Sequence, residues 1–377
     1  MKTQIIHGTY CDAVVYTVDD SETAIDQYAQ AQIKLICDNK ASEGAQIRVM
    51  PDVHPGKVGP IGLTMTVKDR ILPSLVGVDI GCGMTLAKLS KPKLEFPKLD
   101  AVIRECIPTG AHIHTQPKAE FDLNALCCVH HIRQEKALCS LGTLGGGNHF
   151  IELDRDENDD IYIIIHSGSR HLGKETAEIY LREGQKALQD NGVAVPYEMT
   201  WLETELKQQY IHDVSIVQNF AQLNRETILK IILKKMKWKL ADDICSCIHN
   251  FIDCRCSPPI LRKGAISAQA GECVIIPIHM KDGVILGSGK GNPDWNQSAP
   301  HGSGRLYKRE DAYKNFSVSA YKKAMSGIYS SCIGRSTLDE SPFCYRNLSD
   351  IQTAISDTVT IHHILRPIYN YKDSSKD

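Results

Sequence analysis

The segment Val76–Met84, "VGVDIGCGM", brings three glycines, an aspartate and a cysteine together behind the apolar residues "ILPSL". Asp79 and Cys82 are three residues apart, so on a regular strand their side chains would point to opposite faces. The glycines allow the backbone to turn, because glycine adopts conformations that other residues avoid. The sequence therefore predicts a turn that brings a carboxylate and a thiol to one point.

Two interpretations of this turn remain open from the segment alone. A carboxylate with a thiolate suits a borderline divalent cation such as Mn²⁺, Fe²⁺, Co²⁺ or Zn²⁺. The alternative is a glycine-rich turn that carries a buried cysteine of no chemical function.

Composition limits the class of protein. The chain has 377 residues, of which 42% are hydrophobic and 23% charged, as in ordinary globular proteins. It has no apolar run long enough to cross a bilayer and no signal segment in "MKTQIIHGTY", so we expect a cytoplasmic protein with no membrane partner. The 14 cysteines should then be mostly reduced. The net charge of −2 does not indicate a nucleic-acid partner, so nucleic-acid binding would need a local basic surface.

The order of predicted elements indicates the α+β class. Strands are predicted at "QIIHGTY", "DAVVYTVD", "IRVM", "LTMTV", "TLAKL", "IYIIIH", "CVIIPI" and "VILGS". Helices are predicted from a cap at Ser21 to about Asp38, and at Lys174–Asp190, Trp201–Trp238, Arg309–Met325 and Leu348–Leu365, with loops over 107–147. There is no regular βαβ rhythm, so we expect one large domain over residues 1–377, with central β-sheets flanked by helices and a frayed tail at 373–377.

A second glycine run, "LGTLGGGNHFIEL" (141–153), leads into Asn148 and His149. Its backbone can cradle an anion, and His149 is a further candidate metal ligand. A turn with a surface histidine is the alternative.

The stretch "IYIIIHSGSRHLG" (161–173) ends an apolar strand on His166. Functional side chains often lie where a rigid strand ends. Ser167 and Ser169 are small donors, and Arg170 is a cation suited to bidentate contact with phosphate.

The stretch "CSCIHNFIDCRC" (245–256) suggests a zinc knuckle around His249. Its C-x-C pairs are tighter than the usual ligand spacing, which argues against that interpretation. The adjacent imidazole and amide of His249 and Asn250 are of more interest.

The stretch "QSAPHGSGR" (297–305) places His301 before a small turn and Arg305. An imidazole there can ligate metal, move protons or act as a nucleophile. The upstream "GSGKGN" lacks the spacing of a phosphate-binding loop.

Together these motifs resemble the RtcB family of RNA-splicing and RNA-repair ligases. The resemblance rests on "PDVHPGK", "GVDIGCGM", "GTLGGGNHFIE", "HSGSR", "HNF", "RKGAISAQAG" and "HGSGR", in that order, from about Met50 to Lys372. The chain is also similar to the shorter branch of the family that is coupled to a release-factor-like partner.

The resemblance implies an RNA ligase that joins a 3′-phosphate or 2′,3′-cyclic phosphate end to a 5′-hydroxyl end, in RNA repair. It implies GTP and two Mn²⁺ ions as cofactors, and RNA with such ends, a release-factor-like protein or the ribosome as partners. By position it implies that Asp79, Cys82 and His149 hold one metal, and that Cys82, His166 and His249 hold the other. His301 would carry GMP, oriented by Asp52, while Arg170 and Arg305 face RNA or phosphate. The guanylate site would comprise Asn148, His149, Phe150, Ile151, Glu152, His249, Asn250, Pro277, Ile278, His279, Met280, His301, Gly302, Ser303, Gly304 and Lys372.

The sequence departs from the family pattern in the nucleotide pocket. Ile278 and His279 replace the glycine and serine of "PGSM", and Val284 stands where a serine is usual. Two alternative functions remain: a dinuclear metal phosphodiesterase that only opens cyclic phosphates, and a non-catalytic subunit that binds RNA or the ribosome.

Overall fold

Two large β-sheets form the centre of the protein, whose computed structural model describes residues 2–17 and 25–374. All strand pairs within these two sheets are antiparallel except that of β2 with β3. The first sheet follows the order β1 (Lys2–His7), β2 (Asp12–Thr17), β3 (Ile47–His54), β4 (Ile61–Thr66), β12 (Ile260–Lys263) and β11 (Asn250–Asp253). With helices around mainly antiparallel sheets, the predicted α+β class is confirmed.

The second sheet has seven strands and its two edges meet. Its order is β10 (Cys245–Ile248), β6 (Gly83–Leu89), β8 (Ile161–Ser167), β7 (Phe150–Arg155), β17 (Val359–Lys372), β15 (Gly283–Gly289) and β14 (Cys273–His279). A disulfide between Cys245 and Cys273 joins the edge strands β10 and β14, so the sheet closes toward a barrel. The other 12 cysteines are free. Two short pairs complete the strands, β13 (Ala265–Ser267) with β16 (Ser298–Pro300) and β5 (Arg70–Ile71) with β9 (Leu202–Glu203).

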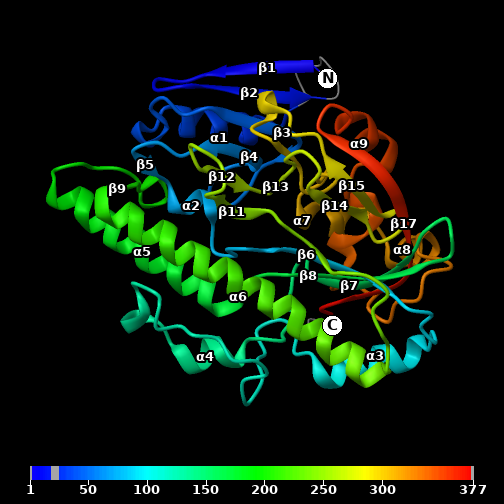
Figure 1. The fold of residues 1–377 in the computed structure, drawn as a ribbon. Coiled ribbons are helices and arrows are strands. Elements are labelled where there is room, and N and C mark those ends of the chain that lie inside the picture. Colours follow the sequence, from blue (N-terminus) through cyan, green and yellow to red (C-terminus); the bar gives the residue numbers. More distant parts are fainter. Residues whose placement is uncertain (1, 18–24, 375–377) are drawn as a thin grey trace.

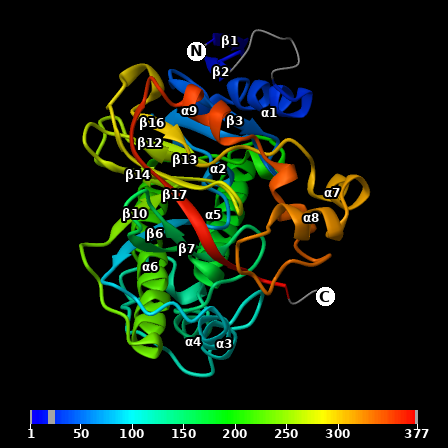
Figure 2. The same ribbon diagram turned by 90° about the vertical axis from the view of Figure 1, so that its right-hand side faces the viewer.

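Helices cover the sheets, and the two longest run side by side (Figure 1). The helices are α1 (Gln27–Cys37), α2 (Pro73–Val76), α3 (Phe96–Cys106), α4 (Gln134–Cys139), α5 (Arg170–Asp190), α6 (Thr204–Met236), α7 (Arg309–Asn315), α8 (Val318–Ala324) and α9 (Leu348–Ala354). Helix α6 contacts β6 and β8 of the second sheet and β11 of the first, so it links the two sheets. Figure 2 shows α7 and α8 projecting to one side of the sheets.

The C-terminal region departs most from the sequence prediction. The helix predicted at Leu348–Leu365 ends at Ala354, and its second half belongs to the 14-residue strand β17. This strand is rich in β-branched residues and pairs with both β7 and β15, so tertiary pairing decides its conformation. The helix predicted at Arg309–Met325 is two helices, because Ser317 caps α8 and interrupts the run.

Two smaller differences concern the start of α1 and the region 107–147. The predicted cap Ser21 lies outside the described residues, and α1 begins at Gln27, where Asp26 accepts hydrogen bonds from two backbone N–H groups. The region 107–147, predicted as loops, contains the short helix α4. Of the helices in the described part of the chain, none combines the length and the apolar character needed to cross a bilayer.

Candidate active site

A turn between α2 and β6 holds Asp79 and Cys82. Gly81 adopts a φ of +70°, and a Cβ there would lie 2.9 Å from the Cα of Gln218 on α6, so only glycine lets the turn approach the helix this closely. The turn directs both side chains toward His149. The Nε2 of His149 lies 3.3 Å from the Cys82 Sγ and 3.0 Å from the Asp79 Oδ2.

Three histidines at or beside the ends of different strands complete this cluster. His149 precedes β7, His166 lies near the end of β8, and His249 lies between β10 and β11. The Nδ1 atoms of His149 and His166 donate to the carbonyls of Leu144 (2.8 Å) and Asn148 (3.1 Å). A carbonyl only accepts, so each Nδ1 carries a proton, and in the neutral form of each ring the Nε2 directs its lone pair at the cluster. The Nε2 of His166 lies 3.0 Å from that of His249.

The electrostatics of this cluster fit a bound cation. Burial lowers the pKa of His166 and of His249, so both imidazoles are neutral near pH 7. Burial raises the pKa of Asp79, but the hydrogen bond and charge of His149 outweigh it and leave the pKa below its ordinary value. Burial, with the charge of Asp79, raises the pKa of the Cys82 thiol.

The donors also fit a metal by position. Cys82, His149 and His166 lie close enough together to hold one ion, and Asp79 and His249 flank them. A bound divalent cation would reverse the effect of burial on the thiol, since a coordinating thiol is deprotonated. A set of thiolate, carboxylate and imidazole donors suits the borderline metals of the sequence prediction.

His301 follows β16 and lies beside the metal-ligand cluster. Its Nδ1 lies 2.8 Å from the Oδ2 of Asp52, which is fully buried on β3. The ring centroids of His301 and His249 are 4.9 Å apart. A carboxylate at Nδ1 holds the proton on that nitrogen, so the Nε2 of His301 keeps its lone pair. This arrangement can activate a histidine nucleophile.

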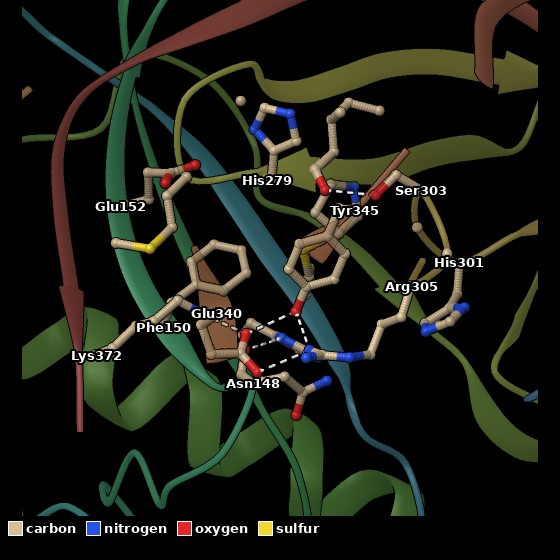
Figure 3. A pocket seen from close by; sticks show the side chains of 18 of the residues that line it. Asn148, Phe150, Glu152, His279, His301, Ser303, Arg305, Glu340, Tyr345 and Lys372 are labelled. Atoms are coloured by element: carbon tan, nitrogen blue, oxygen red, sulfur yellow. Dashed lines mark hydrogen bonds and ion pairs between the residues drawn. The ribbon is translucent and has the colours of Figure 1, made fainter. Parts of the chain in front are cut away.

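A cavity adjoins His301 and the metal-ligand cluster (Figure 3). Phe150 forms part of its wall, and the Lys372 Nζ lies 5.2 Å from the Phe150 ring centroid. Glu152 accepts a hydrogen bond from Asn370, and burial raises its pKa to about 7. Of the predicted nucleotide residues, the cavity is lined by Asn148, Phe150, Glu152, His249, Pro277, Ile278, His279, Met280, His301, Gly302, Ser303, Gly304 and Lys372.

A buried carboxylate that the sequence analysis missed organises the cations of this cavity. Glu340 contacts Lys372 at 3.1 Å, Arg309 at 2.7 Å and Arg305 at 3.3 Å, and the Tyr345 hydroxyl donates to it at 2.8 Å. Figure 3 shows Arg305 and Tyr345 directed toward Glu340. Burial raises the pKa of Glu340, but the three cations outweigh it and hold the pKa at about 2. No motif pointed to Glu340, because it lies far along the chain from the glycine-rich segments.

Some predicted residues lie away from this cavity. Ile151 is fully buried in a hydrophobic cluster, because successive residues of β7 face opposite sides, so its side chain does not line this cavity. Arg170 donates to the Gly110 carbonyl at 2.8 Å and to Thr143 at 3.3 Å, so it braces loops instead of facing the cavity. His149 serves the metal-ligand cluster, and Asn250 lines a second cavity described below.

The three substituted pocket positions are each used structurally. The carbonyl of Ile278 accepts a hydrogen bond from Ser303 at 2.7 Å. His279 accepts backbone hydrogen bonds at Nδ1, and its Nε2 lies 3.3 Å from the Oδ2 of Asp282. Val284 is fully buried in the barrel core. Both ring nitrogens of His279 are therefore engaged within its own turn.

Two adjacent residues of α6, also missed from the sequence, hold the ligand-bearing loops. Arg225 is fully buried and donates to the carbonyls of Gly81 (2.9 Å) and Ser167 (3.0 Å). Asn224 accepts from the backbone N–H groups of residues 142 and 143 and donates to Ser167 and to the carbonyl of Gly168. The sequence feature that could have indicated these two residues is a polar Asn-Arg pair on the buried face of a long predicted helix.

The suspected zinc knuckle does not form. Cys245 is bonded to Cys273, and His249 is directed to His166. Within the described residues, the groups able to hold a metal do not include Cys247, Cys254 or Cys256.

The fold and site define a class of α+β protein with a buried thiol, carboxylate and imidazole cluster beside a histidine–aspartate pair and a cation-lined cavity. A sequence model of the family described as "tRNA-splicing ligase RtcB" matches residues 42–127 and 114–373. The chain belongs to the RtcB family.

Named relatives agree with this assignment. The "RNA-splicing ligase RtcB" of Escherichia coli (strain K12) is 31% identical over 363 residues, which cover 85% of this chain and 88% of the relative. The "RNA-splicing ligase RtcB2" of Escherichia coli (strain ATCC 25922) is 26% identical, over 86% and 87% of the two chains. The "tRNA-splicing ligase RtcB" of Aeropyrum pernix is 25% identical, over 80% and 82%.

Proposed function

We propose that this protein is an RNA ligase that joins a 3′-phosphate or 2′,3′-cyclic phosphate end to a 5′-hydroxyl end, using GTP and Mn²⁺. Family membership and the names of the relatives support the ligase assignment. The observation that carries the proposal is the position of His301, which pairs with buried Asp52 and lies beside both the metal-ligand cluster and the cation-lined cavity.

The chemistry explains why a nucleophile is needed. An RNA 3′-phosphate is a poor electrophile, because hydroxide is a poor leaving group. In the proposed reaction the Nε2 of His301 attacks the α-phosphorus of GTP, and pyrophosphate leaves. An oxygen of the RNA 3′-phosphate then attacks the same phosphorus and breaks the P–N bond. The 5′-hydroxyl finally attacks the 3′-phosphorus and releases GMP. A cyclic phosphate is first opened by water to give the 3′-phosphate.

Asp52 and the histidines prepare this sequence of steps. Asp52 keeps the proton on Nδ1 of His301, so the attacking nitrogen is free. The imidazoles of His149, His166 and His249, with Asp79 and Cys82, would hold two Mn²⁺ ions. When bound, such ions neutralise phosphate charge and align the reacting oxygens.

The nucleotide would lie in the cavity beside His301. Phe150 offers a ring face, Glu152 a carboxyl group, and Arg305 and Lys372 the cations for phosphates. Because burial raises the pKa of Glu152 to about 7, this group can be neutral or ionised when it meets a base. Arg170 would act through the loops that it braces.

Further proposals extend from the same resemblance. We infer a cytoplasmic location and a role in RNA repair, with a release-factor-like protein or the ribosome as partner. The support is the family assignment and, for location, the absence of a membrane-spanning helix in the described residues.

The His301→Ala variant tests the proposal. It removes the nucleophile while leaving Asp52 and all five metal ligands, so it should bind Mn²⁺ normally and form no covalent GMP adduct with labelled GTP. It should still seal an RNA supplied with a preformed 3′-ppG end, because that step needs no histidine carrier.

Three results would decide against the proposal or part of it. An adduct of undiminished yield on His301→Ala would place the nucleophile elsewhere. A wild-type protein that opens cyclic phosphates but forms no adduct would be the phosphodiesterase. One that binds RNA ends without turnover would be the non-catalytic subunit.

A further inference from the structure

A second cavity meets the first at His301, and its wall includes residues that follow His301 in the chain. Its wall includes His54, Asn250, the segment 305–309 and Arg346. It shares His301, Asn148 and His249 with the first cavity, so a group bound in either one reaches the same histidine. The family resemblance assigns Asn250 of this wall to the guanylate site and Arg305 to RNA or phosphate, but it assigns no role to Tyr307 or Arg346.

Arg346 differs from the other cations of this wall. Arg305 and Arg309 pair with Glu340, and the Lys308 Nζ lies 4.5 Å from the ring centroid of Tyr28. The Nη1 of Arg346 is buried and has no hydrogen-bond partner among residues 2–17 and 25–374. A buried guanidinium nitrogen without an acceptor is costly, so the position is suited to an anion that arrives with the substrate.

The backbone around Arg346 is built to admit its guanidinium. The Arg346 N–H donates to the Gly304 carbonyl at 3.2 Å. A Cβ on Gly304, whose φ is +73°, would lie 2.5 Å from the Arg346 Nη1. Gly304 lies three residues after His301 in the "HGSGR" motif, and its lack of a side chain leaves room for the Arg346 guanidinium on the wall of the same cavity. Asp26 also lines the wall, but its Oδ1 accepts the Tyr28 N–H as the cap of α1.

Exposed side chains with flat or apolar surfaces lie beside these cations. Tyr307 is 40% exposed on the wall and packs edge-on to Phe316, with ring centroids 5.1 Å apart. Tyr28 is 67% exposed and Leu306 is 55% exposed. Cations interleaved with exposed aromatic rings are typical of surfaces that bind single-stranded nucleic acid, because phosphates pair with the cations and bases stack on the rings.

We propose that the second cavity holds the RNA strand next to its reacting end, with Arg346 donating to a phosphate of that strand and Tyr307 stacking on a neighbouring base. This inference rests on the proposed function and names two RNA contacts that the family resemblance did not supply. The phosphate chemistry alone would also fit pyrophosphate, whereas the aromatic residues favour RNA.

Direct binding tests the inference without turnover. A fluorescent ten-nucleotide single-stranded RNA with a 3′-phosphate is titrated with protein, without GTP, and followed by anisotropy. Arg346→Ala and Tyr307→Ala should each raise Kd about tenfold. Arg346→Lys should recover part of the loss, and Arg346→Ala should reduce the slope of log Kd against log salt by about one. Arg182→Ala, on α5 beside Glu183, removes the same charge elsewhere and should change Kd less than twofold.

Competition and adduct assays distinguish an RNA-binding site from a pyrophosphate-binding site, and test the proposed ligase activity separately. Inorganic pyrophosphate should displace the RNA no better from wild type than from Arg346→Ala; selective displacement from wild type would assign Arg346 to pyrophosphate and overturn the inference. Equal RNA affinity of Arg346→Ala, Tyr307→Ala and wild type would also overturn it. With labelled GTP, Arg346→Ala should form the adduct and then transfer GMP poorly to RNA. Failure of wild type to form the adduct would instead count against the proposed ligase, while the anisotropy data still decide the RNA contacts.

Discussion

Replacement of Glu340 by glutamine tests whether one carboxylate stabilises the cation cluster of the nucleotide cavity. The Glu340 side chain is 5% exposed and contacts three cations and a tyrosine hydroxyl. Burial raises its pKa, but Lys372, Arg309 and Arg305 lower it to about 2 from an ordinary value of 4.5. At about 1.4 kcal/mol per pH unit, this difference corresponds to about 3 kcal/mol of folding free energy at pH 7. Breaking buried ion pairs typically costs a similar amount.

The lowered pKa of Glu340 determines how its contribution to stability changes with pH. Because the folded-state pKa is lowered, the stabilisation is fully present above the ordinary pKa and is lost as the pH falls through the folded value. The difference in unfolding free energy between wild type and Glu340→Gln should therefore be about 3 kcal/mol at pH 7 and shrink to about 1 kcal/mol at pH 3. Urea unfolding followed by tryptophan fluorescence at several pH values measures it.

A matched control separates this effect from a general charge change. Glu178 is exposed on α5 and lies 3.8 Å from Lys174, so Glu178→Gln should cost less than about 0.5 kcal/mol at any pH. If Glu340→Gln behaved like this control, or if its loss stayed constant from pH 7 to pH 3, the assigned role of the carboxylate would be refuted.

Three further variants probe the site and its support. Cys82→Ser should lower bound manganese at least tenfold at equal free metal, because a hydroxyl does not ionise as a coordinated thiol does; metal analysis at the wild-type level would contradict this. Arg225→Met should destabilise the fold by about 3 kcal/mol in urea unfolding, since it leaves two buried carbonyls without donors; unchanged stability would show that water satisfies them. Paired Ile278→Gly and His279→Ser changes should alter competition among GTP, ATP and dGTP for adduct formation, and unchanged selectivity would show that these positions do not contact the nucleotide.

The strand-end motifs were readable from the sequence because they are local. Glycine near a ligand-type residue at one end of an apolar strand indicated His149 and His166 as candidate ligands, and the structure brings Asp79 and Cys82 to the same point. Alternation and β-branched content likewise indicated most strands of the two sheets.

Features that depend on distant contacts were not readable. The first half of strand β17 was predicted as helix, because the pairing with β7 and β15 that decides its conformation cannot be seen in the local sequence. Glu340 contacts Arg305 and Lys372 only in the folded chain, so no sequence spacing predicts this ion-pair cluster. Ile151 was assigned to the guanylate site together with its neighbours in the motif, whereas the alternation of side chains along β7 directs it into the core.

The Asn224–Arg225 pair shows how stability and site geometry depend on each other. These two consecutive residues satisfy backbone groups in the turn with Gly81, in the glycine run and after His166, so one helix fixes segments that carry four candidate metal ligands. Apolar side chains at both positions would leave these buried groups unpaired, and the loops could regain partners only by moving toward water. Loss of Arg225 should therefore lower stability and metal affinity together. Loss of the thiol in Cys82→Ser should lower metal affinity in a protein that unfolds at nearly the same urea concentration, because serine fills most of the volume and breaks no backbone contact.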